Sequence, residues 1–411
     1  IEKAARALGM DPADIQRKNL LSEGDVSHYG MRMDDVRAKD TFARCMDKAR
    51  WTELRAEIAS FNAANKAFKR GAAVLPLCFG ISFTKIMLNQ GGSLVHVYND
   101  GSVSVSTGAI EMGQGVGRKI AVVASRALGA PLASIRIEST RTTTVANTVA
   151  TAASTGTDIN AMAAQVACIE IKKRLVALAA EKLGVPAETV DLRDGRVVRD
   201  GGAPATELSF AALATAAYEK RIDLSAHGFY ATPGLHYDMK AEHGTPFLYH
   251  VYGCAVVTAT LDVIRGSYRF DDAFIVHDIA ESIDPLVDMG QIEGAFAQGL
   301  GWSCLEELKF DETGRLLSDT LSTYKLPDAH FMPRMDVEFF TRPNPKVVAN
   351  SKAVGEPPLM YGIAGYFAVL DALKAARPDA PSFHDLPMTP EKAMLFLTGD
   401  LQSGDIGKER S

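Results

Sequence analysis

The sequence predicts an α+β fold with about two or three domains. The chain has 411 residues, of which 47% are hydrophobic and 23% charged, the composition of a globular protein. Its first part, residues 1–65, reads mainly as helices. From about Gly71 onward, short segments rich in β-branched and aromatic residues alternate with glycine-rich turns and further helices.

Residues 1–65 are expected to form a helical arm. A first helix ends at Gly9, and Asp11-Pro12 opens the next one. Residues 40–70 continue the helical pattern, with apolar side chains on one face. The chain begins at Ile1, without methionine and within a helical pattern, so we expect it to be a piece of a larger protein.

The middle of the chain alternates strands with helices. The expected strands are GAAVLPL, GISFTKI, SLVHVY, SVSVS, ASIRIES, LSAHGFYAT, FLYHVYGCAVVTATLDV and GSYRFDDAFIVHDI. Helices are expected at about 116–128, before Gly184, at FAALATAAYE, from Asp284-Pro285 onward and near 390–397. Residues 190–207 read as an exposed hairpin and linker, TYKLP and MDVEFFT as extended pieces, and 399–411 as a loose polar tail.

Composition argues against several classes of partner. The net charge is −6 and no Lys/Arg stripe occurs, so neither nucleic acid nor an anionic membrane is an expected partner. No uninterrupted apolar run reaches the length of a membrane span. The cysteines are isolated and odd in number, which favours a reducing compartment such as the cytoplasm and disfavours a disulfide framework or a cysteine-ligated metal site.

The segment SKAVGEPP places Glu356 between Gly355 and a pair of prolines. A residue before proline is biased away from the helical region, so we expect Glu356 to be extended, just ahead of a helix that begins near Pro358. A carboxylate held on such a rigid turn suits a general base. An ordinary helix N-cap is the competing interpretation.

Three other segments indicate close approach to backbone. Gly108–Gly117 lies between a strand and a helix, where N–H groups can face an anion, although it matches neither GxGxxG nor GK[ST] and can equally be a packing turn. Residues 152–156 are small, so they suit either a ligand or a Ser/Thr cap of the following helix. Gly290, Gly294 and Gly299, in the helix expected from Asp284-Pro285 onward, would weaken it unless something packs closely there.

Taken together and in order, seven segments resemble the molybdenum hydroxylase family, and within it the xanthine dehydrogenase branch. They are FGISFT, DGSVSVSTGAIEMGQG, NTVATAAS, LSAHGFYATP, DMGQIEGAFAQGLGW, STYKLP and SKAVGEPP. The resemblance implies mixed α/β subdomains of the xanthine dehydrogenase/aldehyde oxidase type. Residues 1–65 would end the first half of the molybdenum domain, and 66–398 would form the second molybdopterin-binding region, of two subdomains.

The resemblance also implies roles for individual residues. Glu356 matches the general base. Phe83 matches one of two phenylalanines that sandwich the purine, and Thr84 its hydrogen-bonding neighbour; Ala152 and Ala153 would lie near the substrate. The residues matching contacts to the molybdenum–pterin cofactor are Met112, Gly113, Gln114, Ala153, Ser154, Thr155, Gly156, Gln291 and Gly355. No side chain is expected to ligate molybdenum. Lys85 departs from the uncharged residue expected beside Thr84.

By the same resemblance, the reaction is the conversion of hypoxanthine and xanthine to urate, with water as the oxygen source and hydride transfer to a molybdenum–sulfido group. The first half of the molybdenum domain and modules carrying 2Fe-2S, FAD and NAD are expected elsewhere, in a dimer of heterodimers. Alone, this chain is not expected to turn over. The alternatives are a hydroxylase of another N-heterocycle or an aldehyde, an inactive cofactor-free structural fragment, and a phosphate-binding module.

Overall fold

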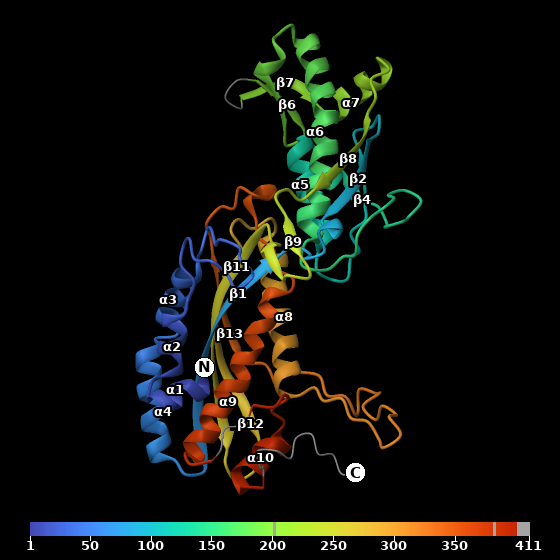
Figure 1. The fold of residues 1–411 in the computed structure, drawn as a ribbon. Helices are drawn as coiled ribbons and strands as arrows, with labels where there is room; N and C mark the ends of the chain where they lie inside the picture. Colours follow the sequence, from blue (N-terminus) through green and yellow to red (C-terminus); the bar gives the residue numbers. More distant parts are fainter. Residues whose placement is uncertain (200–202, 381–383, 401–411) are drawn as a thin grey trace.

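The computed structural model describes residues 1–199, 203–380 and 384–400. They form two elongated lobes that meet end to end (Figure 1). The large lobe combines residues 1–81 with residues 249–380 and 384–400, and the small lobe is built from residues 90–199 and 203–231. Because the small lobe is inserted between the two parts of the large one, the chain crosses the junction more than once.

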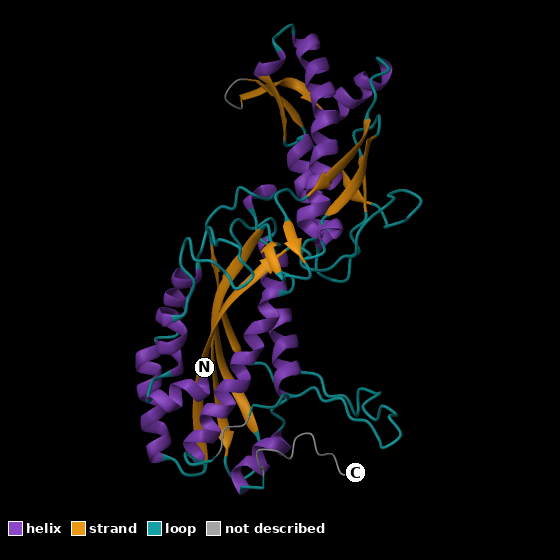
Figure 2. Ribbon diagram, in the orientation of Figure 1, coloured by secondary structure: helices purple, strands orange, loops and turns teal. Residues whose placement is uncertain are grey.

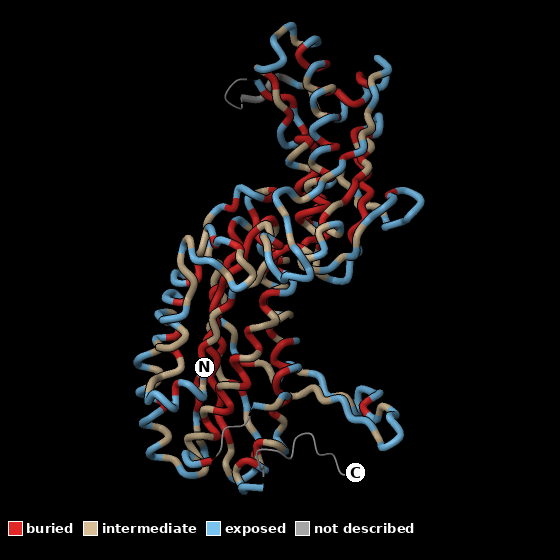
Figure 3. The backbone as a smooth tube through the Cα atoms, viewed as in Figure 1, coloured by how far each residue is buried: buried red, intermediate tan, exposed pale blue. Residues whose placement is uncertain are grey.

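A four-stranded sheet forms the centre of the large lobe. Its order is β1 (Phe68–Ile81), β11 (Tyr249–Asp262), β12 (Tyr268–Asp278) and β13 (Arg334–Phe340). The pairs β1–β11 and β11–β12 are antiparallel, whereas β12–β13 is parallel. Both faces of the sheet are covered, so β11 is buried along almost its whole length (Figure 3).

Helices from the two ends of the chain cover opposite faces of this sheet. On one face lie α3 (Ala38–Lys48) and α4 (Trp51–Ala64), with α1 (Glu2–Leu8) and α2 (Pro12–Lys18) beside them. On the other face lie α8 (Pro285–Cys304) and α9 (Gly362–Ala376), followed by α10 (Pro390–Thr398). The helical arm is therefore one wall of the large lobe.

The small lobe is organised around the long helix α6 (Gly156–Leu183). This helix packs with α5 (Val116–Leu128) and α7 (Phe210–Glu219) against a sheet of order β4-β3-β2-β8 (Figure 2). Those strands are β2 (Gln90–Val97), β3 (Val103–Thr107), β4 (Ile135–Ile137) and β8 (Ser225–Ala231). A second sheet contains β5 (Val190–Arg193), β6 (Arg196–Arg199) and β7 (Ala203–Ser209).

The remaining elements are short. A hairpin of β9 (His236–Asp238) and β10 (His243–Thr245) lies near the junction. Five 3-10 turns complete the described structure: η1 (Ile86–Leu88), η2 (Leu132–Ser134), η3 (Ala187–Thr189), η4 (Val348–Asn350) and η5 (Pro357–Tyr361).

Most local signals for helix ends are confirmed. Gly9 and Gly184 end α1 and α6 in the left-handed conformation that glycine adopts without strain. The carboxylates of Asp11 and Asp284 cap α2 and α8 by accepting hydrogen bonds from backbone N–H groups. These signals act within one turn of chain, which is why they can be read locally.

Some expected elements were wrong. GISFTKI is not a separate strand: β1 continues to Ile81 because β11 pairs with it throughout, and Phe83 and Thr84 lie in the loop that follows. The segment 190–207 is less exposed than expected, since Leu192 and Val197 are buried in the core of the small lobe. TYKLP lies in a long irregular loop that projects from the large lobe (Figure 2).

Two expectations lie wholly or partly beyond the described residues. Residues 200–202 of the expected linker and 401–411 of the expected polar tail are outside the described ranges. The division into 1–65, 66–398 and 399–411 stays a prediction.

One helix of the described chain is long and apolar enough to cross a membrane, although Asp371 and Lys374 interrupt its apolar run. Pro357–Ala376, which joins η5 to α9, meets that criterion by length and composition. More than half of its most apolar window, 56%, is buried inside the molecule. It packs on β1 and β11 and against α8, as a core helix does.

Candidate functional site

A cavity of about 230 Å³ lies where the two lobes meet. Its wall comes from the glycine loop (residues 108–117), the start of α6, α8 and the SKAVGEPP segment. Eight of the residues singled out from the sequence line it: Met112, Gln114, Ala152, Ser154, Gly156, Gln291, Gly355 and Glu356. Segments more than 200 residues apart thus converge on one cavity.

Glu356 is not extended, contrary to the expectation. Its backbone is helical, with φ −86° and ψ −37°. The reason is that its carbonyl accepts a hydrogen bond of 3.1 Å from the N–H of Leu359, which starts the 3-10 turn η5 and requires a helical ψ. A residue before proline prefers an extended backbone. Here this hydrogen bond, together with the burial of Pro357 and Pro358, outweighs that preference.

The side chain of Glu356 does not cap the following helix either. One carboxylate oxygen, Oε1, instead accepts a hydrogen bond of 3.1 Å from the N–H of Ala153. The backbone N–H of Glu356 donates to Ser154 Oγ at 2.8 Å. Within the described residues, the other carboxylate oxygen makes no hydrogen bond. That oxygen is available to accept a proton.

The loop before α6 has an unusual backbone. Ala153 and Ser154 are consecutive non-glycine residues with φ of 54° and 53°. Each such residue costs roughly 1–3 kcal/mol, and strain of this kind gathers at functional sites. The expected Ser/Thr cap is absent: Thr155 is the N-cap residue, but its hydroxyl donates to the carbonyl of Ala152 at 3.1 Å. The strained turn directs the Ala153 N–H at Glu356.

The glycine loop does not keep its N–H groups free for an outside anion. The carboxylate of Glu111 accepts hydrogen bonds from the N–H groups of Gly113, Gly115 and Gly117, at 3.0, 2.9 and 3.0 Å. Partial burial raises the pKa of Glu111, but these donors outweigh it and the pKa lies below its usual value. Sequence reasoning missed Glu111, although an acid directly before alternating glycines is a visible signal.

Gln114 completes this loop. Its side-chain Oε1 accepts from the N–H of Met112 at 2.6 Å, and its Nε2 donates to the carbonyl of Ile110 at 2.8 Å. The loop therefore presents Met112 and Gln114 to the cavity while Glu111 holds its backbone. Gly113 itself is exposed and is not part of the cavity wall.

Two polar pairs that involve residues of the cavity wall had no sequence signal. Lys119 of α5 forms a buried ion pair with Asp288 of α8, at 2.5 Å, and Ser282 Oγ donates to the second oxygen of Asp288. Asp158 of α6 accepts a hydrogen bond of 2.7 Å from the hydroxyl of Tyr249. Burial raises the pKa of Asp158 to about 7, against the lowering effects of Tyr249 and Lys119. Both pairs join the small lobe to the large one.

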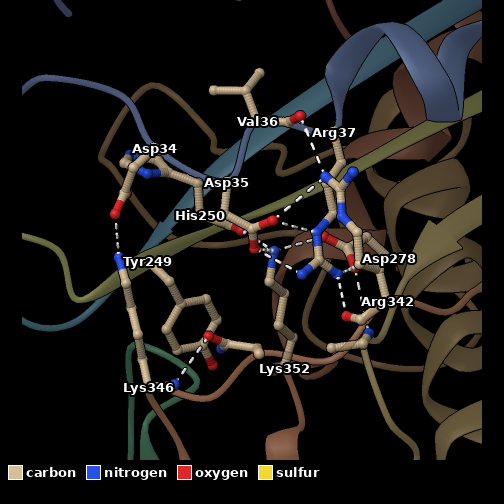
Figure 4. Close-up of polar contacts among 12 residues, drawn as sticks. Asp34, Asp35, Val36, Arg37, Tyr249, His250, Asp278, Arg342, Lys346 and Lys352 are labelled. Atoms are coloured by element: carbon tan, nitrogen blue, oxygen red, sulfur yellow. Dashed lines mark hydrogen bonds and ion pairs between the residues drawn. The ribbon is translucent and has the colours of Figure 1, made fainter. Parts of the chain in front are cut away.

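Beneath the SKAVGEPP segment lies a buried charge network (Figure 4). Lys352 Nζ donates to Asp278 Oδ2 at 2.8 Å and to the carbonyl of His250 at 2.9 Å. The fully buried Arg37, from the helical arm, bonds the other Asp278 oxygen at 2.6 Å and also pairs with Asp35. Burial lowers the pKa of Lys352, and Asp278 opposes that effect. The network anchors the segment that carries Glu356.

Not every predicted residue reaches the cavity. Phe83 and Thr84 are half-buried in the loop after β1. There the side-chain amide of Asn89 accepts a hydrogen bond from the Phe83 N–H and donates one to the Phe83 carbonyl, at 2.8 Å each. Neither lines the cavity. Lys85 is exposed. Ala153 and Thr155 belong to the strained loop but are not in the wall itself.

The glycines of α8 divide into two groups. A Cβ at Gly299 would overlap the backbone carbonyl of Leu359, so the expected close approach of another backbone is real there. A Cβ at Gly290 or Gly294 would meet nothing within 4 Å. Those two glycines are not explained by packing within the described residues.

The chemistry of the wall fits a polar organic cofactor. Gln114 and Gln291 offer side-chain amides, and Ser154 offers a hydroxyl. The backbone is accessible at Gly156 and Gly355, since a Cβ added at either residue would have no neighbour closer than about 3 Å. Among the described residues there is no group of three or more His, Cys, Asp or Glu side chains that could hold a metal ion. Fold and wall together define a cofactor-binding domain.

A comparison with family models identifies the family of this cofactor-binding domain. Residues 44–333 match the model of the molybdopterin cofactor-binding domain. The chain therefore belongs to the molybdopterin cofactor-binding domain family, and the resemblance inferred from its motifs is confirmed at that level.

Individual proteins are similar to most of this chain. Xanthine dehydrogenase of Oryza sativa subsp. japonica is 38% identical over 408 residues, covering 96% of this chain and 28% of that protein. Xanthine dehydrogenase/oxidase of Gallus gallus is 38% identical over 397 residues, covering 94% and 27%. The chain thus spans just over a quarter of the length of these curated relatives.

Solved structures confirm the expected α+β fold type. Quinoline 2-oxidoreductase from Pseudomonas putida 86 matches with a TM-score of 0.83 at 24% identity, covering 97% of this chain and 50% of that one. CO dehydrogenase from Oligotropha carboxidovorans matches with a TM-score of 0.84 at 22% identity, over the same shares of the two chains. At this level of identity the likeness concerns the fold.

Proposed function

We propose that the chain forms part of a molybdenum hydroxylase that oxidises hypoxanthine and xanthine to urate, with Glu356 as the general base. The observation that carries the proposal is the position of Glu356 at a cavity lined also by six residues matched to cofactor contacts and by Ala152, matched to the substrate site. The similarity to xanthine dehydrogenases over more than nine-tenths of the chain supports the purine substrate.

A bound molybdenum–pterin cofactor, with oxo and sulfido ligands, would supply the two-electron oxidation. The residues of this chain bind and orient. Gln114, Gln291 and Ser154 would hold the cofactor by hydrogen bonds, and Gly355 and Gly156 would let it approach backbone. The carboxylate of Glu356, fixed through one oxygen by the Ala153 N–H, would take up a proton on its other oxygen.

The proposal includes partners that the chain does not contain. The first half of the molybdenum domain would close the cavity and supply the second phenylalanine, and 2Fe-2S, FAD and NAD modules would carry electrons away. Assembly as a dimer of heterodimers and a cytoplasmic location belong to the same proposal. On α8, a Cβ at Gly290 or Gly294 would meet nothing within 4 Å, and this open space on the helix supports the presence of a further part of the enzyme there.

The test uses the complete enzyme and the Glu356→Gln variant. Urate formation from hypoxanthine and xanthine should fall by at least about 10²-fold, the contribution typical of a positioned base, while molybdenum and pterin content stay unchanged. Substantial hydroxylation by the variant would rule out Glu356 as the base. Quinoline and an aromatic aldehyde, assayed in parallel, separate the purine proposal from the two alternative substrate classes.

A second variant examines the substrate side. Phe83→Ala should weaken purine turnover more than molybdenum loading, because an aromatic side chain stacks on a flat purine. Loss of molybdenum instead would assign Phe83 a structural role. If the wild-type enzyme contains neither molybdenum nor pterin, the cofactor-free structural alternative replaces the proposal.

A further inference from the structure

Tyr249 connects three parts of the cavity through a single hydroxyl group. It lies at the first position of β11, in the large lobe, and is only 3% exposed. Its hydroxyl donates to Asp158 Oδ2, in the small lobe, at 2.7 Å. The same oxygen accepts a hydrogen bond of 2.9 Å from the backbone N–H of Ala353, in the SKAVGEPP segment.

The direction of these bonds follows from the chemistry of the groups. A phenol has one proton, and the Ala353 N–H can only donate, so the phenol proton must go to the carboxylate. Burial, together with the neighbouring charge of Asp158, raises the pKa of Tyr249 well above its usual value, so the phenol keeps its proton. Hydrogen bonds in such a chain polarise and strengthen one another.

The two groups that the phenol joins have little exposure to bulk water. Asp158 and Ala353 are 5% and 8% exposed. A buried donor or acceptor that loses its partner carries the full cost of its lost hydration. The hydroxyl of Tyr249 therefore matters to both neighbours at once.

The segment on which Ala353 lies is held on its other side as well. Lys352 is bonded to Asp278 of the large-lobe sheet, and its Nζ lies 5.9 Å from the centre of the Tyr249 ring. Two consecutive residues of the segment are thus fixed, three to four positions before Glu356. Between them and Glu356 lie only Val354, which is buried, and Gly355.

We propose that Tyr249 is a positioning residue, which ties Asp158 to the Ala353 N–H and thereby sets where the Glu356 carboxylate lies in the cavity. The inference rests on the proposed function of Glu356 and adds a residue that acts through it. Tyr249 itself does not touch the cavity, since it is absent from its wall. Its effect is transmitted by the backbone from Ala353 to Glu356.

The first experiment compares Tyr249→Phe with wild type in the complete enzyme. The ring is kept, so folding should be preserved, but a misplaced catalytic group can cost about 10²-fold in rate. We expect kcat to fall about 10- to 100-fold, KM to change less than about 3-fold, and molybdenum and pterin content to stay the same. The matched control is Tyr324→Phe, which removes a tyrosine–carboxylate bond of 2.5 Å to Glu306 in the projecting loop, outside the cavity wall.

The second experiment distinguishes positioning from general structural support. In a Glu356→Gln background, Tyr249→Phe should cause no further loss of residual turnover, because the group that it positions has already gone. A further loss as large as in the wild-type background would overturn the proposal. So would loss of molybdenum in Tyr249→Phe alone.

A third measurement does not depend on turnover. Amide hydrogen exchange of the Ala353 N–H should be at least about tenfold faster in Tyr249→Phe, whereas β11 itself stays protected. Unchanged exchange at Ala353 would contradict the proposed contact. If wild type oxidises no purine, the proposed substrate fails, while this exchange result still tests the contact between Tyr249 and the Ala353 N–H.

Discussion

The backbone N–H of Glu356 donates a hydrogen bond of 2.8 Å to the hydroxyl oxygen of Ser154, which lies in the other lobe. The next contact, from the Ala153 N–H to the Glu356 carboxylate, is 3.1 Å long. A strained turn of the small lobe thus holds both the backbone and the side chain of one acid in the large lobe. The position of that acid depends on how the two lobes meet.

Ser154→Ala should lower turnover of the complete enzyme about tenfold, equivalent to about 1.4 kcal/mol of transition-state stabilisation. The reason is that the Glu356 N–H loses its acceptor and the acid becomes less well oriented. Steady-state kinetics measure the change. Ser134→Ala is the control, since that hydroxyl bonds only the nearby carbonyl of Pro131. Equal rates for the two variants would contradict the assigned role of Ser154.

Two glycines of α8 should respond oppositely to alanine. Gly299→Ala places a methyl group against the carbonyl of Leu359 and should destabilise the chain by about 1–3 kcal/mol. Gly290→Ala meets no atom within 4 Å and should stabilise the helix by up to about 1 kcal/mol. Urea unfolding of the 411-residue chain measures both. If both variants shift the unfolding midpoint in the same direction, the predicted opposite effects of Gly299→Ala and Gly290→Ala are wrong.

Asp158→Asn should change how stability depends on pH. The folded pKa of about 7 lies above the usual 3.8, so the folded chain binds the extra proton and wild-type stability falls as pH rises between these values. Asparagine keeps an acceptor for Tyr249 but cannot ionise. The variant should be more stable than wild type above the folded pKa, by up to about 4 kcal/mol, and similar to wild type near pH 4.

Urea unfolding across this pH range tests the prediction for Asp158. Asp223→Asn is the control, because the hydroxyl of Ser225 lowers the pKa of that exposed carboxylate below 3.8, so its stability difference from wild type should stay constant across this range. A stability difference between Asp158→Asn and wild type that does not vary with pH would show that Asp158 ionises normally.

Lys352→Met should destabilise the chain by about 3–5 kcal/mol, because it leaves buried carboxylate charge with one cation fewer. Lys346→Met removes an ion pair of 2.5 Å between Lys346 and Asp34, which is partly exposed, and should cost less than about 1 kcal/mol. Chemical denaturation of the two variants gives the comparison. Similar losses would mean that the buried network contributes no more than a surface pair.

What could be read from the sequence was local or carried by long motifs. Gly9, Gly184 and the Asp-Pro pairs at 11 and 284 mark helix ends because capping involves residues within one turn. The segments 112–114, 152–156, 291 and 355–356 were expected to contact one cofactor and its substrate, and most of them do line one cavity. The family membership predicted from those segments is confirmed.

The tertiary structure decided what depends on residues far apart in the chain. The helical backbone of Glu356 follows from its turn and from the burial of Pro357 and Pro358, and the residue is held in place by Ser154, 202 residues away. The charge of Lys352 is balanced by Asp278, which also pairs with Arg37, and no pattern near Lys352 indicates either residue. Local preferences of the backbone span a few residues, whereas burial, ion pairing and strain are settled only when distant segments pack together.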